Sequence, residues 1–150
     1  FVGIEPAVKP AARQSRAKIV GVLATEATFQ SNLFANKVQQ FAQDVKVLTC
    51  ACPALVDLVE MGHIGSSSTR ALLRNHLAPL LKSGADTLVL GCTRYSFFRH
   101  TIAELVGPSI EIINPSPAVA RQVERVLTRH GLLNPEILEG LPPFTMYSTL

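Results

Sequence analysis

The sequence predicts an α/β fold with a mostly parallel sheet flanked by helices. Four short apolar segments are rich in Leu or β-branched residues and lack clean alternation, which is typical of strands buried on both faces. Amphipathic stretches with helical spacing separate these segments, and strands that alternate with helices indicate βαβ units. We expect the strands at residues 18–24, 45–49, 86–90 and 110–113.

Capping residues and apolar stripes mark the expected helices. Thr28 or Ser31 precedes the first stripe, and Ser66 opens a longer helix that stops near Gly84. Pro79 falls inside this longer helix and should kink or split it, because proline lacks the N–H donor. The stripes comprise Leu33, Phe34, Val38 and Phe41; Leu55, Leu58 and Val59; Leu73, Leu77, Leu80 and Leu81; Phe98, Ile102 and Leu105; and Val119, Val123, Val126 and Leu127.

The composition describes a globular chain with no sign of nucleic-acid binding or of a membrane span. Of the 150 residues, 47% are apolar, which suffices for a core, and the net charge of +3 comes from scattered basic residues. No apolar run approaches the roughly 20 residues of a membrane helix. The N-terminus has no signal-peptide pattern, so we expect a cytoplasmic protein with free thiols. The start at Phe1, in strand-like sequence, indicates a fragment or a processed chain.

The thiol of Cys92 follows directly on the third expected strand. Ligands collect at the carboxyl ends of strands in open α/β sheets, where polar turns also follow the first two strands, at residues 24–28 and 49–53. Gly91 should let the chain turn sharply, so that Cys92 and Thr93 face the crevice. A thiolate there would gain from the backbone N–H groups of the next helix and from Arg94. The alternative, which spacing alone slightly favours, is that Cys92 is a small buried apolar residue.

Four stretches of the sequence carry a family resemblance. The most specific is Asp-Thr-Leu-Val-Leu-Gly-Cys-Thr at residues 86–93, and supporting motifs lie at residues 3–11, 22–28 and 52–62. On these motifs the chain resembles the glutamate racemases, of the cofactor-independent aspartate/glutamate racemase superfamily. The resemblance implies two α/β lobes with the site between them. Residues 1–107 would form the second lobe, which carries Cys92, and residues 108–150 would complete the first lobe.

The family resemblance also implies a reaction, in which two thiols on opposite sides of the α-carbon interconvert L- and D-glutamate without pyridoxal phosphate or a metal. Cys92 matches the second thiol and Glu60 an acid or base that supports it. Thr93 matches a donor to the substrate carboxylate. Thr25 and Thr28 match a pair near the substrate, and helix capping is an equally good interpretation of both. The product, D-glutamate, would supply bacterial peptidoglycan.

The sequence departs from the family at two places. Arg94 stands where the family has His, and Arg cannot release a proton near neutral pH to act as acid or base, although it can hold Cys92 as thiolate or pair with Glu60. The Asp-Ser-Gly and Cys-Asn-Thr-Ala motifs, which carry the family's first thiol, do not occur in these 150 residues, and Asn114 replaces the usual Asp. We therefore expect the chain alone to be inactive. Uncovered apolar faces would favour a homodimer or a further partner segment.

Other functions compete with the racemase interpretation. Arg94 and the missing motifs favour a degenerate racemase kept as a binding or regulatory module. An aspartate or hydantoin racemase is a further alternative, against which the stretch Glu-Pro-Ala-Val-Lys-Pro-Ala at residues 5–11 argues. A zinc site is not expected, because the histidines fall at no ligand spacing. The residues concerned are Cys50, Cys52, His63, His76, His100 and His130.

Overall fold

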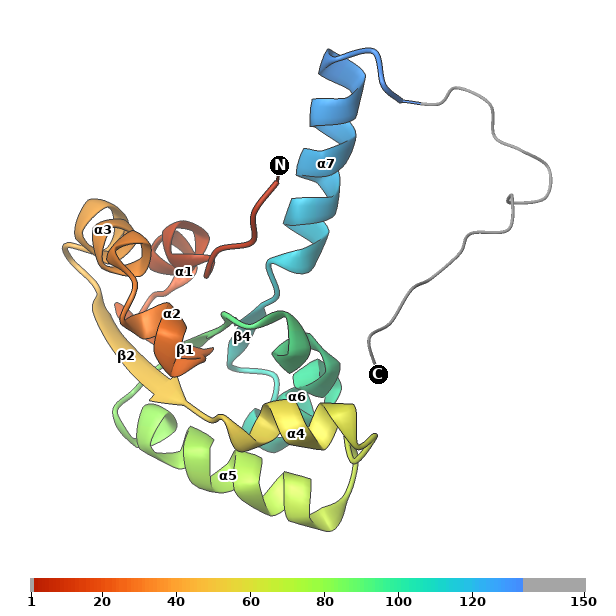
Figure 1. Ribbon diagram of the computed structural model, residues 1–150. Helices are drawn as coiled ribbons and strands as arrows, with labels where there is room; N and C mark the ends of the chain where they lie inside the picture. Colours follow the sequence, from red (N-terminus) through yellow and green to blue (C-terminus); the bar gives the residue numbers. More distant parts are fainter. Residues whose placement is uncertain (1, 134–150) are drawn as a thin grey trace.

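The computed structural model describes residues 2–133 and places four parallel strands in one sheet (Figure 1). The strands are β1 (Ile19–Ala24), β2 (Lys46–Ala51), β3 (Thr87–Leu90) and β4 (Glu111–Ile113). Their order across the sheet is β2-β1-β3-β4, so the two central strands are β1 and β3. The α/β fold with a parallel sheet, and a strand in each of the four expected segments, are thereby confirmed.

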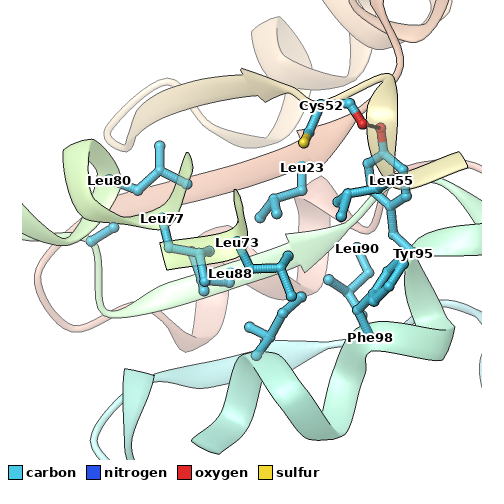
Figure 2. Packing of buried hydrophobic residues seen from close by; sticks show 12 residues of the cluster. Leu23, Cys52, Leu55, Leu73, Leu77, Leu80, Leu88, Leu90, Tyr95 and Phe98 are labelled. Carbon is cyan, nitrogen blue, oxygen red and sulfur yellow. Dashed lines mark hydrogen bonds between the residues drawn. The ribbon is translucent and has the colours of Figure 1, made fainter. Parts of the chain in front are cut away.

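Two layers of helices cover the sheet. One face carries α1 (Val8–Gln14) and α3 (Asn32–Phe41), which pack on Val20, Val22 and Val89. The other face carries α4 (Ala54–Glu60), α5 (Ser67–Lys82), the 3₁₀ helix η1 (Thr93–Phe98) and α6 (Arg99–Val106). Figure 2 shows the core on that face, where Leu23, Leu88 and Leu90 meet the leucines of α5. Because successive strand residues point to opposite faces, apolar side chains fill both cores without alternating with polar ones.

The helix starts follow the capping residues. Ser31 Oγ accepts a hydrogen bond from the Phe34 N–H at 3.2 Å, and Ser66 Oγ accepts one from the Thr69 N–H at 3.1 Å. Ser31, rather than Thr28, therefore caps α3. At the other end of α5, Gly84 has a φ of +86°, which an L side chain rarely adopts, so the chain can turn from this helix into β3.

Pro79 lies inside α5, which continues as one helix over residues 67–82. The predicted split of this helix is therefore not observed. Leu77 and Leu80, on either side of the proline, are both buried in the core. We attribute the continuity of the helix to this packing, which offsets the hydrogen bond that proline cannot donate.

The strand β4 pairs with β3 at the edge of the sheet, with Leu88 beside Ile112. The sequence placed this strand beyond the boundary at residue 107, whereas it belongs to the same sheet as the strands before it.

The helix α7 (Ser116–Arg129) then projects away from the two layers, as Figure 1 shows, and none of its residues is buried. Its apolar stripe includes the exposed Val123. The division at residue 107 and the homodimer stay predictions, and residues 134–150 lie outside the described residues.

A short helix, α2 (Glu26–Phe29), follows β1. Among the helices of the described residues, none is long and apolar enough to cross a membrane.

Asp86 ties the loop before β1 to the beginning of β3. Its carboxylate accepts hydrogen bonds from Ser15 Oγ at 2.6 Å and from the backbone N–H groups of Arg16 and Ala17, both at 2.8 Å. Thr87 Oγ1 donates a further bond at 3.1 Å. Burial raises the pKa of Asp86, but these hydrogen bonds outweigh burial and leave the pKa below its usual value.

We expect Asp86→Asn to lower the free energy of unfolding by about 1–2 kcal/mol, because an amide group would face donors that now meet a carboxylate oxygen. The pKa of Asp86 in the folded state lies below its unfolded value of about 3.9. The stabilisation by this carboxylate is therefore present above about pH 3.9, and it is lost as the pH falls through the folded-state pKa. Urea unfolding of both proteins between pH 7 and pH 3 measures this. The control is Asp44→Asn, because Asp44 makes an exposed ion pair with Lys18 at 3.1 Å. Equal losses of unfolding free energy in the two variants would contradict the stabilising role of the Asp86 hydrogen bonds.

Candidate functional site

The turn from β3 into η1 brings Gly91 against β1. The Gly91 N–H donates to the Leu23 carbonyl at 2.7 Å, which extends the pairing of the two strands by one residue. A Cβ at this position would lie 2.9 Å from the Ala24 Cβ and 3.1 Å from the Leu23 carbonyl oxygen. The sequence predicts that Gly91 lets the chain turn sharply. The structure shows a different reason for the glycine, namely that a Cβ here would crowd the Ala24 Cβ and the Leu23 carbonyl oxygen of β1.

Cys92 follows Gly91 and occupies the N-cap position of η1. Its carbonyl accepts a hydrogen bond from the Tyr95 N–H at 3.1 Å, which fixes the first turn of η1. The Cys92 side chain is half-buried at the margin of the core, whereas Cys52 is fully buried. Cys92 thus lies at the carboxyl end of β3, packed against the core cluster on the α4–α6 face and less buried than Cys52.

A cavity of about 260 Å³ opens beside this turn. Thr93 and Gly91, the neighbours of Cys92, form part of its lining, together with residues from α2, α3 and the segment before α1. The size suits a small metabolite rather than a macromolecule. The lining consists of Ile4, Glu5, Pro6, Thr28, Ser31, Leu33, Phe34, Lys37, Gly91 and Thr93.

The two threonines after β1 hydrogen-bond to each other. Thr25 Oγ1 and Thr28 Oγ1 lie 3.0 Å apart, and the side chain of Thr25, at the N-cap position of α2, makes no capping hydrogen bond. Capping therefore does not explain this pair. Thr28 also lines the cavity, where its hydroxyl is available to a ligand, and Thr25 holds that hydroxyl in place.

Arg94 makes an ion pair with Glu60 that connects η1 to α4. Arg94 Nε lies 2.5 Å from Glu60 Oε1, and about half of each side chain is exposed. Of the two roles that the sequence left open for Arg94, the structure shows the pair with Glu60. The carboxylate proposed to support Cys92 is thus held by a permanent cation.

None of the three cysteines is among the residues that line the cavity, although Cys92 lies between Gly91 and Thr93, which do. Cys50 Sγ lies 3.6 Å from His76 Nδ1 on α5, and burial raises the pKa of this thiol. Burial and the neighbouring Cys50 raise the pKa of Cys52 to about 11, so Cys52 stays protonated near neutral pH. The Cys52 carbonyl accepts a hydrogen bond from the buried Tyr95 hydroxyl at 2.8 Å, which joins η1 to the end of β2 (Figure 2).

Within residues 2–133, no three side chains of the types His, Cys, Asp and Glu come together as a metal site.

Sequence reasoning missed Glu5 and Lys37. Glu5 belongs to a family-like motif without an assigned role, and Lys37 lies one turn after Phe34 in the expected helix. Glu5 precedes α1, and a basic residue such as Lys37 beside an apolar stripe is ordinary on a helix surface, so periodicity gives no signal for either residue.

Comparisons with known proteins identify the family of this chain. The family model described as Asp/Glu/Hydantoin racemase matches residues 1–123. The chain belongs to this family. It is 46% identical over 140 residues to a glutamate racemase of Herpetosiphon aurantiacus, covering 93% of this chain and 55% of the relative. It is also 51% identical over 133 residues to a glutamate racemase of Pseudomonas putida, covering 89% of this chain and 50% of the relative. The chain therefore spans about half the length of these relatives.

Solved structures show the same fold. A crystal structure of Escherichia coli glutamate racemase in complex with L-glutamate and an activator matches with a TM-score of 0.75 and 28% identity. The match covers 84% of this chain and 48% of that one. A Thermus thermophilus glutamate racemase in complex with β-chloro-D-alanine matches with a TM-score of 0.68 and 34% identity, covering 86% of this chain and 48% of that one.

We expect Gly91→Ala to destabilise the protein by about 1–3 kcal/mol, because the new methyl group would overlap the Ala24 Cβ and crowd the Leu23 carbonyl oxygen, both fixed in a central strand. Gly65→Ala is the matched control, since a Cβ at Gly65 meets nothing within 4 Å. Chemical unfolding of both variants measures the difference. A loss in Gly91→Ala no larger than that in Gly65→Ala would contradict the close approach.

Proposed function

We propose that this chain supplies one side of the active site of a glutamate racemase, which interconverts L- and D-glutamate by proton transfer between two thiols and the α-carbon. The observation that carries the proposal is the turn of Gly91, Cys92 and Thr93 beside a small cavity at the carboxyl end of β3. The proposal is supported by the membership of this chain in the racemase family and by its similarity to glutamate racemases. In the proposed role the enzyme works in the cytoplasm and supplies D-glutamate for peptidoglycan.

Cys92 is proposed as one of the two thiols. As a thiolate it would remove the α-proton from one enantiomer, and as a thiol it would return a proton to the same face in the reverse reaction. Neither Cys50 nor Cys52 suits the second role, because the first contacts α5 and the second is fully buried. The second thiol must come from protein outside these 150 residues, and we expect the chain alone to be inactive.

The hydroxyl groups at the cavity are proposed to bind the substrate. Thr93 and Thr28 both line it, and a hydroxyl can donate to a carboxylate oxygen. Thr25 would act through Thr28, whose hydroxyl lies 3.0 Å from its own. No cofactor is part of this proposal.

The ion pair between Arg94 and Glu60 favours a second candidate function. Arg94 occupies the position of the family's His, and its guanidinium does not release a proton near neutral pH and pairs with the Glu60 carboxylate. A degenerate racemase that binds an amino acid without turning it over would tolerate this pair. A racemase for aspartate or a hydantoin is a narrower alternative within the same family.

The proposal predicts that Cys92→Ser abolishes racemisation in a chimaera where this chain replaces the matching segment of the Herpetosiphon aurantiacus relative. A serine hydroxyl is a far weaker acid than a thiol, so we expect a loss of at least about 100-fold. Polarimetry with pure D-glutamate measures turnover, and α-proton exchange in D₂O reports the first step.

The matched control is Cys50→Ser, which changes a thiol that contacts His76 and should leave turnover unchanged. The 150-residue chain alone should show no turnover. Activity of Cys92→Ser above about 10% of the parent chimaera, or turnover by the chain alone, would refute the assignment.

A separate prediction concerns Arg94→His in the same chimaera. Histidine can exchange a proton near neutral pH, so we expect racemisation to rise by at least about tenfold. Arg99→His, an exposed change on α6, is the control for a nonspecific effect. No gain over the parent chimaera would exclude Arg94 as the cause of impaired proton return.

A further inference from the structure

The turn that carries Cys92 is anchored on both sides by hydrogen bonds to other strands. On one side, the Gly91 N–H donates to the Leu23 carbonyl in β1 at 2.7 Å. On the other side, the Tyr95 hydroxyl donates to the Cys52 carbonyl, directly after β2, at 2.8 Å (Figure 2). Residues 92–94 lie between these two anchors. Their position therefore depends on both hydrogen bonds.

Tyr95 links this turn to the beginning of α4. Its backbone N–H donates to the Cys92 carbonyl at 3.1 Å, so its main chain belongs to the turn itself. The Cys52 carbonyl that its hydroxyl reaches also accepts a hydrogen bond from the Leu55 N–H at 3.1 Å, in the first turn of α4. The ring is fully buried in the core cluster that contains Leu55 and Leu90. One side chain thus joins η1 to α4 from inside the core.

The residues within the turn contribute less to holding it in place. Cys92 lies at the N-cap position of η1, but its side chain makes no capping hydrogen bond. Arg94 forms a second link from η1 to α4 through Glu60, and about half of each of these side chains is exposed. An exposed ion pair contributes little to rigidity, because solvent screens it and both side chains lose conformational entropy. The buried hydroxyl of Tyr95 is therefore the stronger of the two links.

The Tyr95 hydroxyl is a permanent hydrogen-bond donor. Burial and the neighbouring thiols of Cys92 and Cys52 raise the pKa of Tyr95 well above its usual range, so the hydroxyl keeps its proton near neutral pH. It cannot act as a general base, and its donor is already directed at the Cys52 carbonyl. What it supplies to the site is a fixed distance rather than a proton.

We propose that Tyr95 is a positioning residue for the racemisation, whose hydroxyl holds the Cys92 turn at a fixed place relative to α4. This inference rests on the proposed function, in which the Cys92 thiol exchanges a proton with the substrate. Such a step depends steeply on the distance between the reacting atoms. Without the hydroxyl, the turn keeps its anchor on β1 through Gly91 and loses its anchor at α4, so the thiol occupies a wider range of positions.

Tyr95→Phe removes this hydroxyl and leaves the ring in the core. The Cys52 carbonyl keeps its hydrogen bond from Leu55, so we expect the variant to fold, which thermal unfolding checks. The matched control is Ser15→Ala, because it removes another buried hydroxyl, one that donates to Asp86 at the amino end of the sheet. An effect of lower stability in general would appear in both variants.

The first experiment treats the folded 150-residue chain with iodoacetamide and follows the alkylation of each cysteine by peptide mass spectrometry. Cys50, which contacts His76 on α5, is the reference thiol in the same sample. We expect Tyr95→Phe to raise the ratio of the Cys92 to the Cys50 alkylation rate by at least about threefold, because local opening of the turn exposes Cys92. Ser15→Ala should leave this ratio unchanged. An unchanged ratio in Tyr95→Phe overturns the proposal.

Hydrogen exchange tests the anchor without a substitution. The Tyr95 and Leu55 amides, which bond to the Cys92 and Cys52 carbonyls, should exchange with D₂O as slowly as the amides of β1. Exchange faster than that of β1 by about tenfold or more would show a turn that opens by itself, and it would also overturn the proposal.

The second experiment measures racemisation in the chimaera. Tyr95→Phe should lower kcat about tenfold and change KM less than about threefold, because the cavity residues on α2 and α3 stay in place. A fall in kcat that Ser15→Ala shares would reflect lost folded enzyme and would refute the positioning role. A raised alkylation ratio, together with a chimaera that shows no turnover, would support Tyr95 and refute the racemase. An unchanged kcat for Tyr95→Phe in an active chimaera would support the racemase and refute Tyr95.

Discussion

The close approach of β3 to β1 at Gly91 is the constraint on which the candidate site depends. The hydrogen bond from the Gly91 N–H to the Leu23 carbonyl holds the end of β3 against β1, and only a residue without a Cβ fits there. Cys92 and Thr93 come next along the chain, so their positions at the edge of the sheet follow from that contact. The threonine pair follows β1 directly, and the same contact therefore brings residues from two βα turns to one cavity.

The opposite end of the same strands is held by Asp86. Its carboxylate binds the loop that leads into β1, and its backbone pairs with Ile19 of β1 and with Glu111 of β4. The strands β1 and β3 are thus fixed at both ends, by a carboxylate at the amino end and by a glycine contact at the carboxyl end. A rigid pair of central strands is a suitable support for a site that must hold reacting atoms within a fraction of an ångström.

The sequence alone predicted the sheet and most of its helices, because each strand is a short apolar run and the longer helices have a cap or a stripe, whereas the short helices α1 and α2 were not predicted. The four expected strands match the observed ones to within a residue or two, and Ser31 and Ser66 cap the helices they precede. Periodicity could not reveal which distant residues meet. The pairs of Arg94 with Glu60 and of Lys37 with Glu5 join segments that are far apart in sequence, and the crowding around Gly91 arises only when β3 lies beside β1. The continuity of α5 through Pro79 likewise depends on core packing.

Two ion pairs lie near the carboxyl edge of the sheet. Lys37 and Glu5 both line the cavity beside Thr93, so this pair places one charge of each sign in its wall. Arg94 and Glu60 pair outside that lining, and in the proposed racemase Arg94 could not replace the family's His as a proton carrier, because a guanidinium does not release a proton near neutral pH. On that proposal, the residues that would bind the substrate differ from the residue that would limit proton transfer. Arg94, rather than the Cys92 turn, would then distinguish a working racemase from a binding module.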